Sequence, residues 1–431
     1  MLLLIDLDGT LIYTINPEWK SLKDGACSIE SYLDNLPFFP GAKEFIKKRQ
    51  DMGDSIVVVS DSHFKYVEPI CKRLNVEYLA LADKPNDIKT LNYLRNTNYY
   101  PMLKQGKAMF IGDTELDIEL ARRLEIPSIW LYQYVVSDSE KEKLDIRDCI
   151  GKERSVKKLG PTYEAKSFDE VEQILQDPVS SLYMLEAIFQ GKESGNVINN
   201  TTATYQDRSE AKIVCLGRQQ EGLCDSFAIA HQYQLLSSPD RTPEFLDKLS
   251  GCVSAYLAQQ VKAGQEWHYF TYLSDKATTQ PANKMKEIFD RVETDIPKIQ
   301  LLRWKEGVTH SLRNENLYGD RKRYLEKFLE LGCPELNLRG KNVIVLDDQI
   351  TTSATAWHVI RCLRERGAYN VLFVGLFQMV LRVNTNFACP RCGKPMSVKL
   401  RRKDGGKFLS CTPPEYRGNG CGYAMNLPLF L

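Results

Sequence analysis

Residues Leu2–Thr10 read LLLIDLDGT, and this stretch decides the fold of the N-terminal part of the chain. Its apolar residues form a short buried strand, and Asp6 and Asp8 follow at positions i and i+2, ahead of a tight turn at Gly9. Open α/β sheets bind their ligands beyond the carboxyl ends of the strands. The stretch therefore predicts a sheet of parallel strands with two carboxylates at its ligand-binding edge.

Apolar strand-like runs alternate with helix-like segments from residue 1 to about residue 130, an order typical of a parallel sheet covered by helices. A capping box of Ser167 and Glu170 opens a further amphipathic helix over 167–175. The expected strands are 2–5, 55–59, 109–111 and 128–131, and the expected helices between them are 42–50 and 117–124.

Polar residues also follow the later strands. Ser60 ends the second strand in VVVSDS, Lys84 lies in ADKPND, and the third strand runs into GDTELD, which holds Asp113 and Asp117. Acids, a hydroxyl and a lysine in this order resemble the four motifs of the haloacid dehalogenase-like (HAD) superfamily. The resemblance covers residues 1–177.

This resemblance implies a phosphatase. Asp6 is then the nucleophile that forms an aspartyl-phosphate, and Asp8 protonates the leaving oxygen and later activates water. Ser60 and Lys84 hold the phosphoryl oxygens. Phosphoryl transfer has to manage negative charge, for which Mg²⁺ is the usual means. The implied Mg²⁺ ligands are Asp6, Asp8 through its backbone carbonyl, Asp113 and Asp117.

The space between the motifs indicates how far the site is covered. Between Asp8 and Ser60 lie 51 residues, but 39–43 already looks like the start of a core helix. Only 23 residues separate Ser60 from Lys84, too few for a cap domain. We therefore expect a nearly capless, open site that admits a bulky substrate or is covered by another domain.

A second α/β segment follows a mostly polar stretch. Its expected strands are 212–216, 268–273, 343–346 and 371–377, and its expected helices include 284–292 and 356–366. The fold class predicted for the chain is α/β, with two doubly wound parallel-sheet domains and a small C-terminal zinc ribbon. The expected divisions are 1–177, a connecting segment 178–210, 211–384 and 385–431.

Residues 343–355 read VIVLDDQITTSAT, a buried strand, two acids and a threonine-rich loop ahead of a helix. Hydroxyls and backbone N–H groups at a helix N-terminus form a phosphate site. The stretch resembles the phosphoribosyltransferase signature, with Ser353 where that family usually has glycine, a residue freer in φ. The resemblance implies that Asp347 and Asp348 contact the ribose of phosphoribosyl pyrophosphate (PRPP). The residues implied to cradle its 5-phosphate are Thr351, Thr352, Ser353, Ala354 and Thr355.

Upstream, the strand 268–273 leads into a loop that fits a pyrophosphate loop, and the arrangement is similar to the ComF-type phosphoribosyltransferases. Basic side chains further along the chain could also contact the pyrophosphate. Two alternatives to a working transferase stay open: a silent domain that senses PRPP or a nucleotide, and a buried strand and turn with no ligand. The loop residues are Ser274, Asp275 and Lys276, and the basic residues are Arg313, Arg321 and Arg323.

Four cysteines near the C-terminus, Cys389, Cys392, Cys411 and Cys421, provide the thiolates of a closed structural zinc site. The segment resembles the small zinc ribbons of type IA topoisomerases, although nine residues between the last two cysteines are more than usual. From residue 385 on there are eight Lys/Arg against two Asp/Glu, with aromatics interleaved. This composition suits single-stranded nucleic acid, and equally a solvated or protein-docking face of a small metal-held domain.

The whole chain has a formal net charge of +1, which gives no overall attraction to nucleic acid or membranes. None of its apolar runs approaches the ~20 residues that a membrane helix needs. It begins without a basic n-region, so we expect a cytoplasmic protein with no membrane contact. The other eight cysteines are scattered singly and read as buried thiols.

The combined prediction is a bifunctional, Mg²⁺-dependent enzyme of nucleotide or ribose-phosphate metabolism. One domain is a hydrolase that removes phosphate from a small molecule or nucleotide, and the other uses PRPP. The alternative is a nucleic-acid-associated repair or defence factor, with an end-phosphatase, a nucleotide-sensing domain and a nucleic-acid-binding zinc ribbon.

Overall fold

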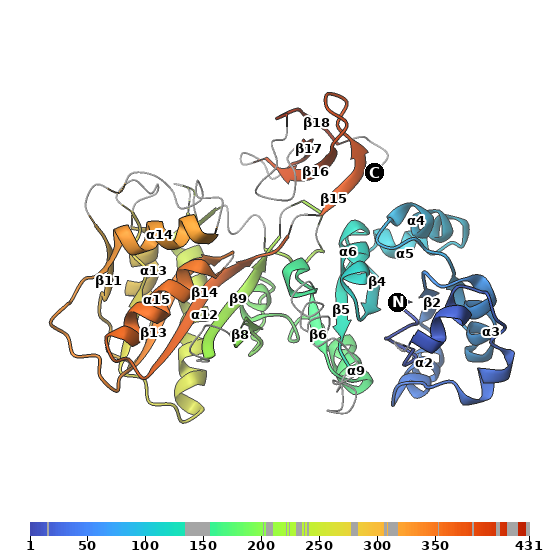
Figure 1. The fold of residues 1–431 in the computed structure, drawn as a ribbon, viewed down its shortest axis with the longest axis horizontal. Coiled ribbons are helices and arrows are strands. Elements are labelled where there is room, and N and C mark those ends of the chain that lie inside the picture. Colours follow the sequence, from blue (N-terminus) through green and yellow to red (C-terminus); the bar gives the residue numbers. More distant parts are fainter. Residues whose placement is uncertain are drawn as a thin grey trace.

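The computed structural model shows two α/β units and a small third sheet (Figure 1). Among the residues it describes, no helix has both the length and the apolar character needed to cross a membrane. The described residues are 1–14, 17–133, 156–200, 202–203, 210–220, 222–223, 225–229, 235–236, 238, 241–276, 283–305, 308, 318–351, 353–381, 383–401, 406–411 and 421–427.

The first unit is built on a six-stranded parallel sheet in the order β3-β2-β1-β4-β5-β6. Four of these strands match the expected ones. The sequence patterns missed β3 and β6, which are short strands at the two edges of the sheet. The bounds are β1 Leu2–Ile5, β2 Ser55–Val59, β3 Glu77–Leu79, β4 Ala108–Gly112, β5 Ser128–Leu131 and β6 Tyr163–Ala165.

Helices cover both faces of this sheet, because both faces are apolar. Leu3 and Ile5 of β1 belong to one buried cluster, and Leu2 and Leu4 belong to another. Successive side chains of a strand point to opposite faces, so the sheet is doubly wound. The helices are α2 Ala42–Asp51, α3 Phe64–Leu74, α4 Asp87–Asn96, α5 Tyr100–Lys104, α6 Glu115–Arg123 and α9 Phe168–Gln176.

A small helical insertion lies between β1 and α2. It contains the 3-10 turn Pro17–Trp19, the short helix α1 Lys20–Lys23 and the 3-10 helix Glu30–Asn35. Trp19 and Leu22 of this insertion pack into the first core. The insertion is therefore part of the domain body, as its limited length predicts, and it is too small to be a separate cap domain.

The second unit has a sheet with the order β10-β13-β14-β9-β7, whose first four strands are parallel; β7 and β8 both pair antiparallel with β9. Buried clusters again lie on both faces. The expected α/β class, with a Rossmann-like six-stranded parallel sheet and a four-cysteine cluster, is thus confirmed. The strands are β7 Ile198–Asn199, β8 Thr202–Ala203, β9 Glu210–Gln219, β10 Tyr269–Tyr272, β13 Asn342–Ile350 and β14 Asn370–Met379. The remaining elements are α10 Met184–Phe189, α12 Pro243–Lys262, α13 Lys284–Arg291, β11 Leu302–Trp304, α14 Tyr318–Phe328, β12 Leu329–Leu331 and α15 Ala354–Glu365.

Two expectations about this unit differ from the structure. The strand over 343–346 does not end before the acids: β13 continues through Asp347 and Asp348 to Ile350, because the longer β14 supplies partners at Phe377 and Gln378. The segment 178–210, expected to be a connection, contributes α10 to the second core and pairs β7 with β9.

The third sheet consists of β15 Asn384–Ala388, β16 Pro395–Leu400, β17 Lys407–Ser410 and β18 Ala424–Asn426, all antiparallel. It contacts the first unit through polar side chains. Asn386 donates to Asp87 at 2.5 Å and accepts from Arg123 at 3.0 Å. Lys407 and Glu125 form an ion pair next to this contact.

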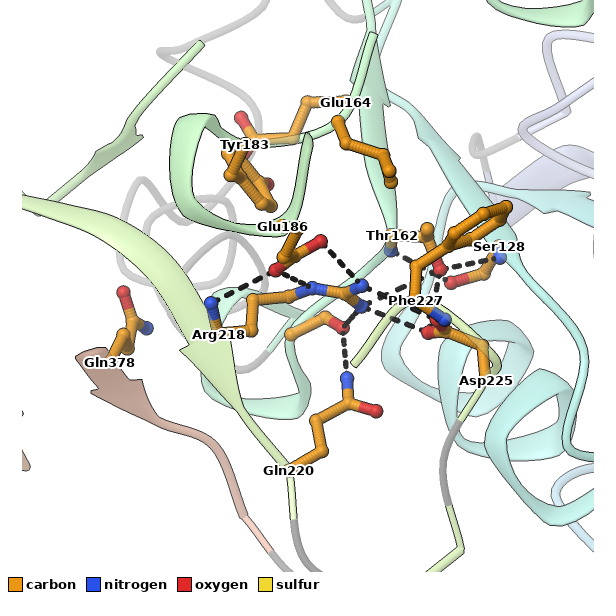
Figure 2. A network of polar contacts seen from close by, with 12 residues as sticks. Ser128, Thr162, Glu164, Tyr183, Glu186, Arg218, Gln220, Asp225, Phe227 and Gln378 are labelled. Carbon is orange, nitrogen blue, oxygen red and sulfur yellow. Dashed lines mark hydrogen bonds and ion pairs between the residues drawn. The ribbon is translucent and has the colours of Figure 1, made fainter. Parts of the chain in front are cut away.

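A buried polar network joins the two α/β units around Arg218 of β9 (Figure 2). The guanidinium contacts Glu186 of α10 at 2.9 Å and Asp225 at 3.1 Å. It also donates to the carbonyl of Gly160, ahead of β6, at 2.9 Å. Arg218, Glu186 and Asp225 are all at least 96% buried.

Thr162 continues the network into the first sheet. Its hydroxyl donates to Asp225 at 2.9 Å and accepts from the backbone N–H of Ser128, the first residue of β5, at 3.0 Å. Burial raises the pKa of the Glu186 carboxyl, while the Arg218 guanidinium opposes this rise. The network thus holds two carboxylates in the interior by means of one cation.

Removing that cation should destabilise the protein strongly. We expect Arg218→Ala to lower the free energy of unfolding by about 3–5 kcal/mol, because two carboxylates stay buried without their partner. Arg291→Ala is the control: Arg291 pairs with Asp247 on the surface, and its loss should cost less than about 1 kcal/mol. Urea unfolding followed by circular dichroism measures both. Equal shifts in the two variants would contradict the structural role of Arg218.

Candidate active site

Lys84 lies between two carboxylates at the carboxyl edge of the first sheet. Its Nζ is 2.7 Å from Oδ1 of Asp6 and 2.6 Å from Oδ1 of Asp117. All three side chains are almost completely buried. Asp6 follows β1, and Asp117 lies in the first turn of α6 after β4. The parallel topology therefore brings together three motifs that are far apart in the sequence.

Asp113 joins Asp6 and Asp117 in a cluster of carboxylates whose oxygens lie within 4.8 Å of one another. Thr10 donates to Asp113 at 3.1 Å. Thr114 holds Asp117 with its backbone N–H at 3.0 Å and its hydroxyl at 2.7 Å. Three oxygen donors oriented in this way fit Mg²⁺, a hard cation that prefers carboxylates.

The electrostatics of this cluster favour bound cations. Burial raises the pKa of Asp6 well above its ordinary value, and the charge of Asp117 adds to the effect. Burial alone would lower the pKa of Lys84, but the two carboxylates outweigh it and the pKa is raised. Lys84 therefore stays charged. The three carboxylates repel one another, and a second cation bound between them would offset this repulsion.

Asp8 has a separate set of partners. Its Oδ1 accepts from the hydroxyls of Thr14 at 2.5 Å and Tyr66 at 2.9 Å, and its Oδ2 accepts from Ser62 at 2.8 Å. The ammonium of Lys23, in the small insertion, lies 3.5 Å from Oδ1. These donors fix the carboxylate in one orientation.

Sequence reasoning missed those four donors. Ser62 could have been found, since it lies two residues after Ser60 in the same SDS loop. Tyr66 lies one turn further along, in α3. Lys23 belongs to the insertion, and Thr14 belongs to the segment that leads into it. No sequence motif marks either residue.

Ser60 is 1% exposed at the end of β2, and its hydroxyl accepts from the backbone N–H of Ser62 at 3.1 Å. Asp61 in the same loop accepts from the backbone N–H of Lys84 at 2.8 Å. The structure thus places the loops of all four predicted motifs at one edge of the sheet.

In the second unit, Asp347 and Asp348 lie side by side in β13. The backbone N–H of Asp348 donates to the Asp347 carboxylate at 2.9 Å, and the Asp348 carboxylate pairs with the nearly buried Lys284. Burial, followed by the charge of Asp348, raises the pKa of Asp347 well above its ordinary value. The acidic pair thus already has one cation beside it.

The loop after β13 contains the helix start at Ser353, which has φ +59°. This is the left-handed conformation that glycine adopts without cost and serine does not. Ala354 begins α15 and Thr355 follows it, with Thr351 on the other side of the turn. Thr352 lies outside the described residues.

The predicted pyrophosphate loop makes contacts of a different kind. The carbonyl of Ser274 accepts from the indole of Trp304 at 2.8 Å, and Asp275 accepts from the backbone N–H of Met285 at 2.8 Å. Lys276 lies over the rings of Trp304 and Tyr324, and burial lowers the pKa of its ammonium to about 8. Of the basic stretch, Arg313 and the Arg321 side chain lie outside the described residues, whereas Arg323 is exposed.

Cys389, Cys392, Cys411 and Cys421 form one group, with all four sulfurs within 4.8 Å of one another. The backbone N–H of Lys394 is the main cause that lowers the pKa of Cys392 to about 6, which favours the thiolate that a metal requires. Cys421, whose spacing is unusual, lies 3.5 Å from Cys389 and belongs to the group.

No family model matches the sequence, and no curated protein matches it either. Solved structures of HAD-superfamily hydrolases match part of the chain. A HAD-superfamily hydrolase from Ehrlichia chaffeensis is 18% identical, with a TM-score of 0.24, over 30% of this chain and 85% of its own. A predicted phosphoglycolate phosphatase from Haemophilus somnus is 20% identical, with a TM-score of 0.28, over 41% and 97%. A haloacid dehalogenase-like hydrolase from Streptococcus pneumoniae is 14% identical, with a TM-score of 0.28, over 41% and 98%.

The left-handed backbone at Ser353 makes a simple prediction. Ser353→Gly should relieve the strain and raise the free energy of unfolding by about 0.5–1 kcal/mol, because the αL cost of a non-glycine residue exceeds the entropy that glycine adds to the unfolded chain. Ser238→Gly is a control at a described position without a positive φ and should be neutral or destabilising. Urea midpoints compare the two variants, and a destabilised Ser353→Gly variant would contradict the observed conformation.

Proposed function

We propose that the first unit is a Mg²⁺-dependent phosphatase that acts through an aspartyl-phosphate on Asp6. The observation that carries the proposal is the position of Lys84, between Asp6 and Asp117 and beside the three-carboxylate cluster. A nucleophilic carboxylate next to a fixed ammonium and a divalent-cation site can receive a phosphoryl group and neutralise its charge. Mg²⁺, held by Asp6, Asp113 and Asp117, would supply further charge stabilisation.

In the first step, a carboxylate oxygen of Asp6 attacks phosphorus and the ester P–O bond breaks. The leaving oxygen needs a proton, and Asp8 is the acid two residues away. Its present donors, Thr14, Ser62 and Tyr66, hold its carboxylate in one orientation. Lys84 stays near the transferred group and balances the charge of its oxygens.

In the second step, Asp8 accepts a proton from water, and the water oxygen attacks phosphorus. The bond between phosphorus and Asp6 breaks, inorganic phosphate leaves, and the Asp6 carboxylate is restored. Among the described residues, the insertion between β1 and α2 is too short to form a cap domain, which supports phosphorylated small molecules or nucleotides as substrates.

For the second unit we propose a PRPP site at Asp347, Asp348 and the loop over 351–355. Two adjacent acids suit ribose hydroxyls, and the strained turn at Ser353 presents backbone N–H groups at the start of α15. PRPP could serve there as a substrate for transfer to a base or as a sensed ligand. Lys284 beside Asp348 supplies a cation in either case.

We also propose zinc at the four cysteines, where four converging thiols match a closed structural site. The other free cysteines fit a reducing compartment such as the cytoplasm. The basic, aromatic composition of residues 385–431 supports docking of a nucleic acid or a protein at this sheet.

Loss of the nucleophile tests the phosphatase. Asp6→Asn should lower kcat by at least ~10³-fold on phosphomonoesters with Mg²⁺, because no aspartyl-phosphate can form. The matched control, Asp51→Asn, makes the same change at an exposed position of α2 and should retain full activity. The assay measures phosphate release from sugar phosphates, nucleotides and 3′- or 5′-phosphorylated oligonucleotides. Activity that persists in Asp6→Asn would exclude this mechanism.

Calorimetry with PRPP and Mg²⁺ tests the second unit. The wild type should bind PRPP, and Asp348→Asn should weaken binding by ~10-fold or more, since a charge-assisted hydrogen bond is lost. Glu293→Gln, an exposed acid of the same unit, should bind as the wild type does. No heat of binding would exclude both the transferase and the sensor. Pyrophosphate release with a panel of bases then separates these two functions.

A further inference from the structure

Two aromatic side chains at the end of β5 lie beside the carboxylate cluster of the first unit. Trp130 is level with Gly112, the last residue of β4, and Tyr132 comes directly after the end of β5. Trp130 packs into the same buried cluster as Ile118 of α6, the helix whose first turn carries Asp117. Tyr132 is two residues further along, so its side chain points to the same side of the sheet, closer to the ligand-binding edge.

The chain on either side of Tyr132 is hydrogen-bonded to the loops of the site. Before it, the indole of Trp130 donates to the carbonyl of Asp113 at 3.1 Å. After it, the side-chain amide of Gln133 donates to the carbonyl of Thr10 at 3.0 Å, and the hydroxyl of Thr10 donates to the Asp113 carboxylate at 3.1 Å. Tyr132 is therefore held next to the loops that follow β1 and β4.

The ring of Tyr132 is fixed in position and remains partly exposed. It stacks on Trp130 with the ring centroids 4.4 Å apart and an angle of 27° between the planes. Trp130 is only 4% exposed, whereas Tyr132 is half-buried. A ring that is fixed before a ligand arrives loses little conformational freedom on binding, and aromatic side chains of this kind are the surfaces on which bases stack.

Lys166 adds hydrogen-bond donors beside this ring. Its ammonium lies 5.9 Å from the centroid of Tyr132, and its side chain is exposed. In the part of the chain that the structure describes, no carboxylate pairs with this ammonium. A lysine ammonium has three donors, which can bond to the carbonyl oxygens and ring nitrogens of a heterocycle. The pair thus suits a nucleobase better than a purely apolar ring.

The position of the nucleophile relative to this ring sets the size of the ligand. Ile5 is level with Ile111 in β4, so Asp6, Gly112 and Trp130 are level on three neighbouring strands. Neighbouring strands lie ~4.8 Å apart, which separates the backbones of Asp6 and Trp130 by about 10 Å. A ring bonded directly to the ester oxygen would stay close to phosphorus, whereas a ring joined to phosphate through a sugar can reach across this distance.

We infer that Tyr132 and Lys166 form a base subsite of the phosphatase, and that its substrate is a nucleoside 5′-monophosphate. The phosphate meets Asp6 and Lys84, the base stacks on Tyr132, and the sugar spans the distance between them. The inference rests on the proposed phosphatase and adds the chemical class of its substrate.

Phosphate release from two esters tests the subsite. AMP and ribose 5-phosphate have the same leaving oxygen on the same sugar carbon and differ in the base. The kcat/KM for AMP should exceed that for ribose 5-phosphate at least ~10-fold, as one base stacked on an aromatic ring provides. Equal kcat/KM values would overturn the inference and leave the phosphatase standing. No release from either ester or from the oligonucleotides would contradict the phosphatase itself, and this inference with it.

Variants then locate the base. The ratio of the two kcat/KM values is compared because it cancels any general loss of active enzyme. Tyr132→Leu should bring the ratio close to one, Tyr132→Phe should keep it because the ring remains, and Lys166→Gln should lower it by ~3-fold or more. Tyr369→Leu, the same change at a tyrosine of the second unit that is 79% exposed, is the matched control and should keep the wild-type ratio. A wild-type ratio in Tyr132→Leu, or its loss in Tyr132→Phe, would overturn the inference.

Discussion

The buried guanidinium of Arg218 constrains how the two α/β units meet. Its partners come from both sides of the junction: Glu186 from the helix α10 of the second unit, and the Gly160 carbonyl from the approach to β6 of the first. A buried charge tolerates little displacement, since each lost hydrogen bond leaves an uncompensated group in a medium of low dielectric. Directional bonds thus set the orientation of the units, in addition to apolar contact.

Both candidate sites lie close to this junction. Gln219 follows Arg218 in β9 and is hydrogen-bonded to Gln349, the residue after Asp348. On the other side, β5 starts at Ser128, and its Trp130 donates from the indole to the carbonyl of Asp113 at 3.1 Å. The strand that carries Arg218 is therefore hydrogen-bonded to the residue next to the acidic pair of one unit, and the strand that receives the network supports the carboxylate cluster of the other.

Local patterns predicted most strands of the two large sheets and the polar residues that follow them, because a short apolar run followed by an acid is visible within a few residues. Contacts between distant segments could not be predicted in this way. Glu186 and Arg218 are 32 residues apart, and α10 lies in a segment that reads as a polar connection. Two of the donors to Asp8, Lys23 and Thr14, come from the insertion and the segment that leads into it, where no motif marks them. The length of β13 depends on β14, so the acids at 347 and 348 fall inside a strand.

The contact of Asn386 with Asp87 places the cysteine-rich sheet three residues from Lys84 along the chain. A four-thiolate module of this size depends on its metal for its fold. If the carboxylates and the cysteines bind metal as proposed, a chelator would act on the proposed phosphatase centre by two routes: it would withdraw the divalent ion from the carboxylates, and it would weaken the support that the cysteine-rich sheet gives to the lysine loop. Recovery of activity with magnesium alone would indicate loss of the ion from the carboxylates. Recovery that also requires zinc would indicate loss of the metal from the cysteines.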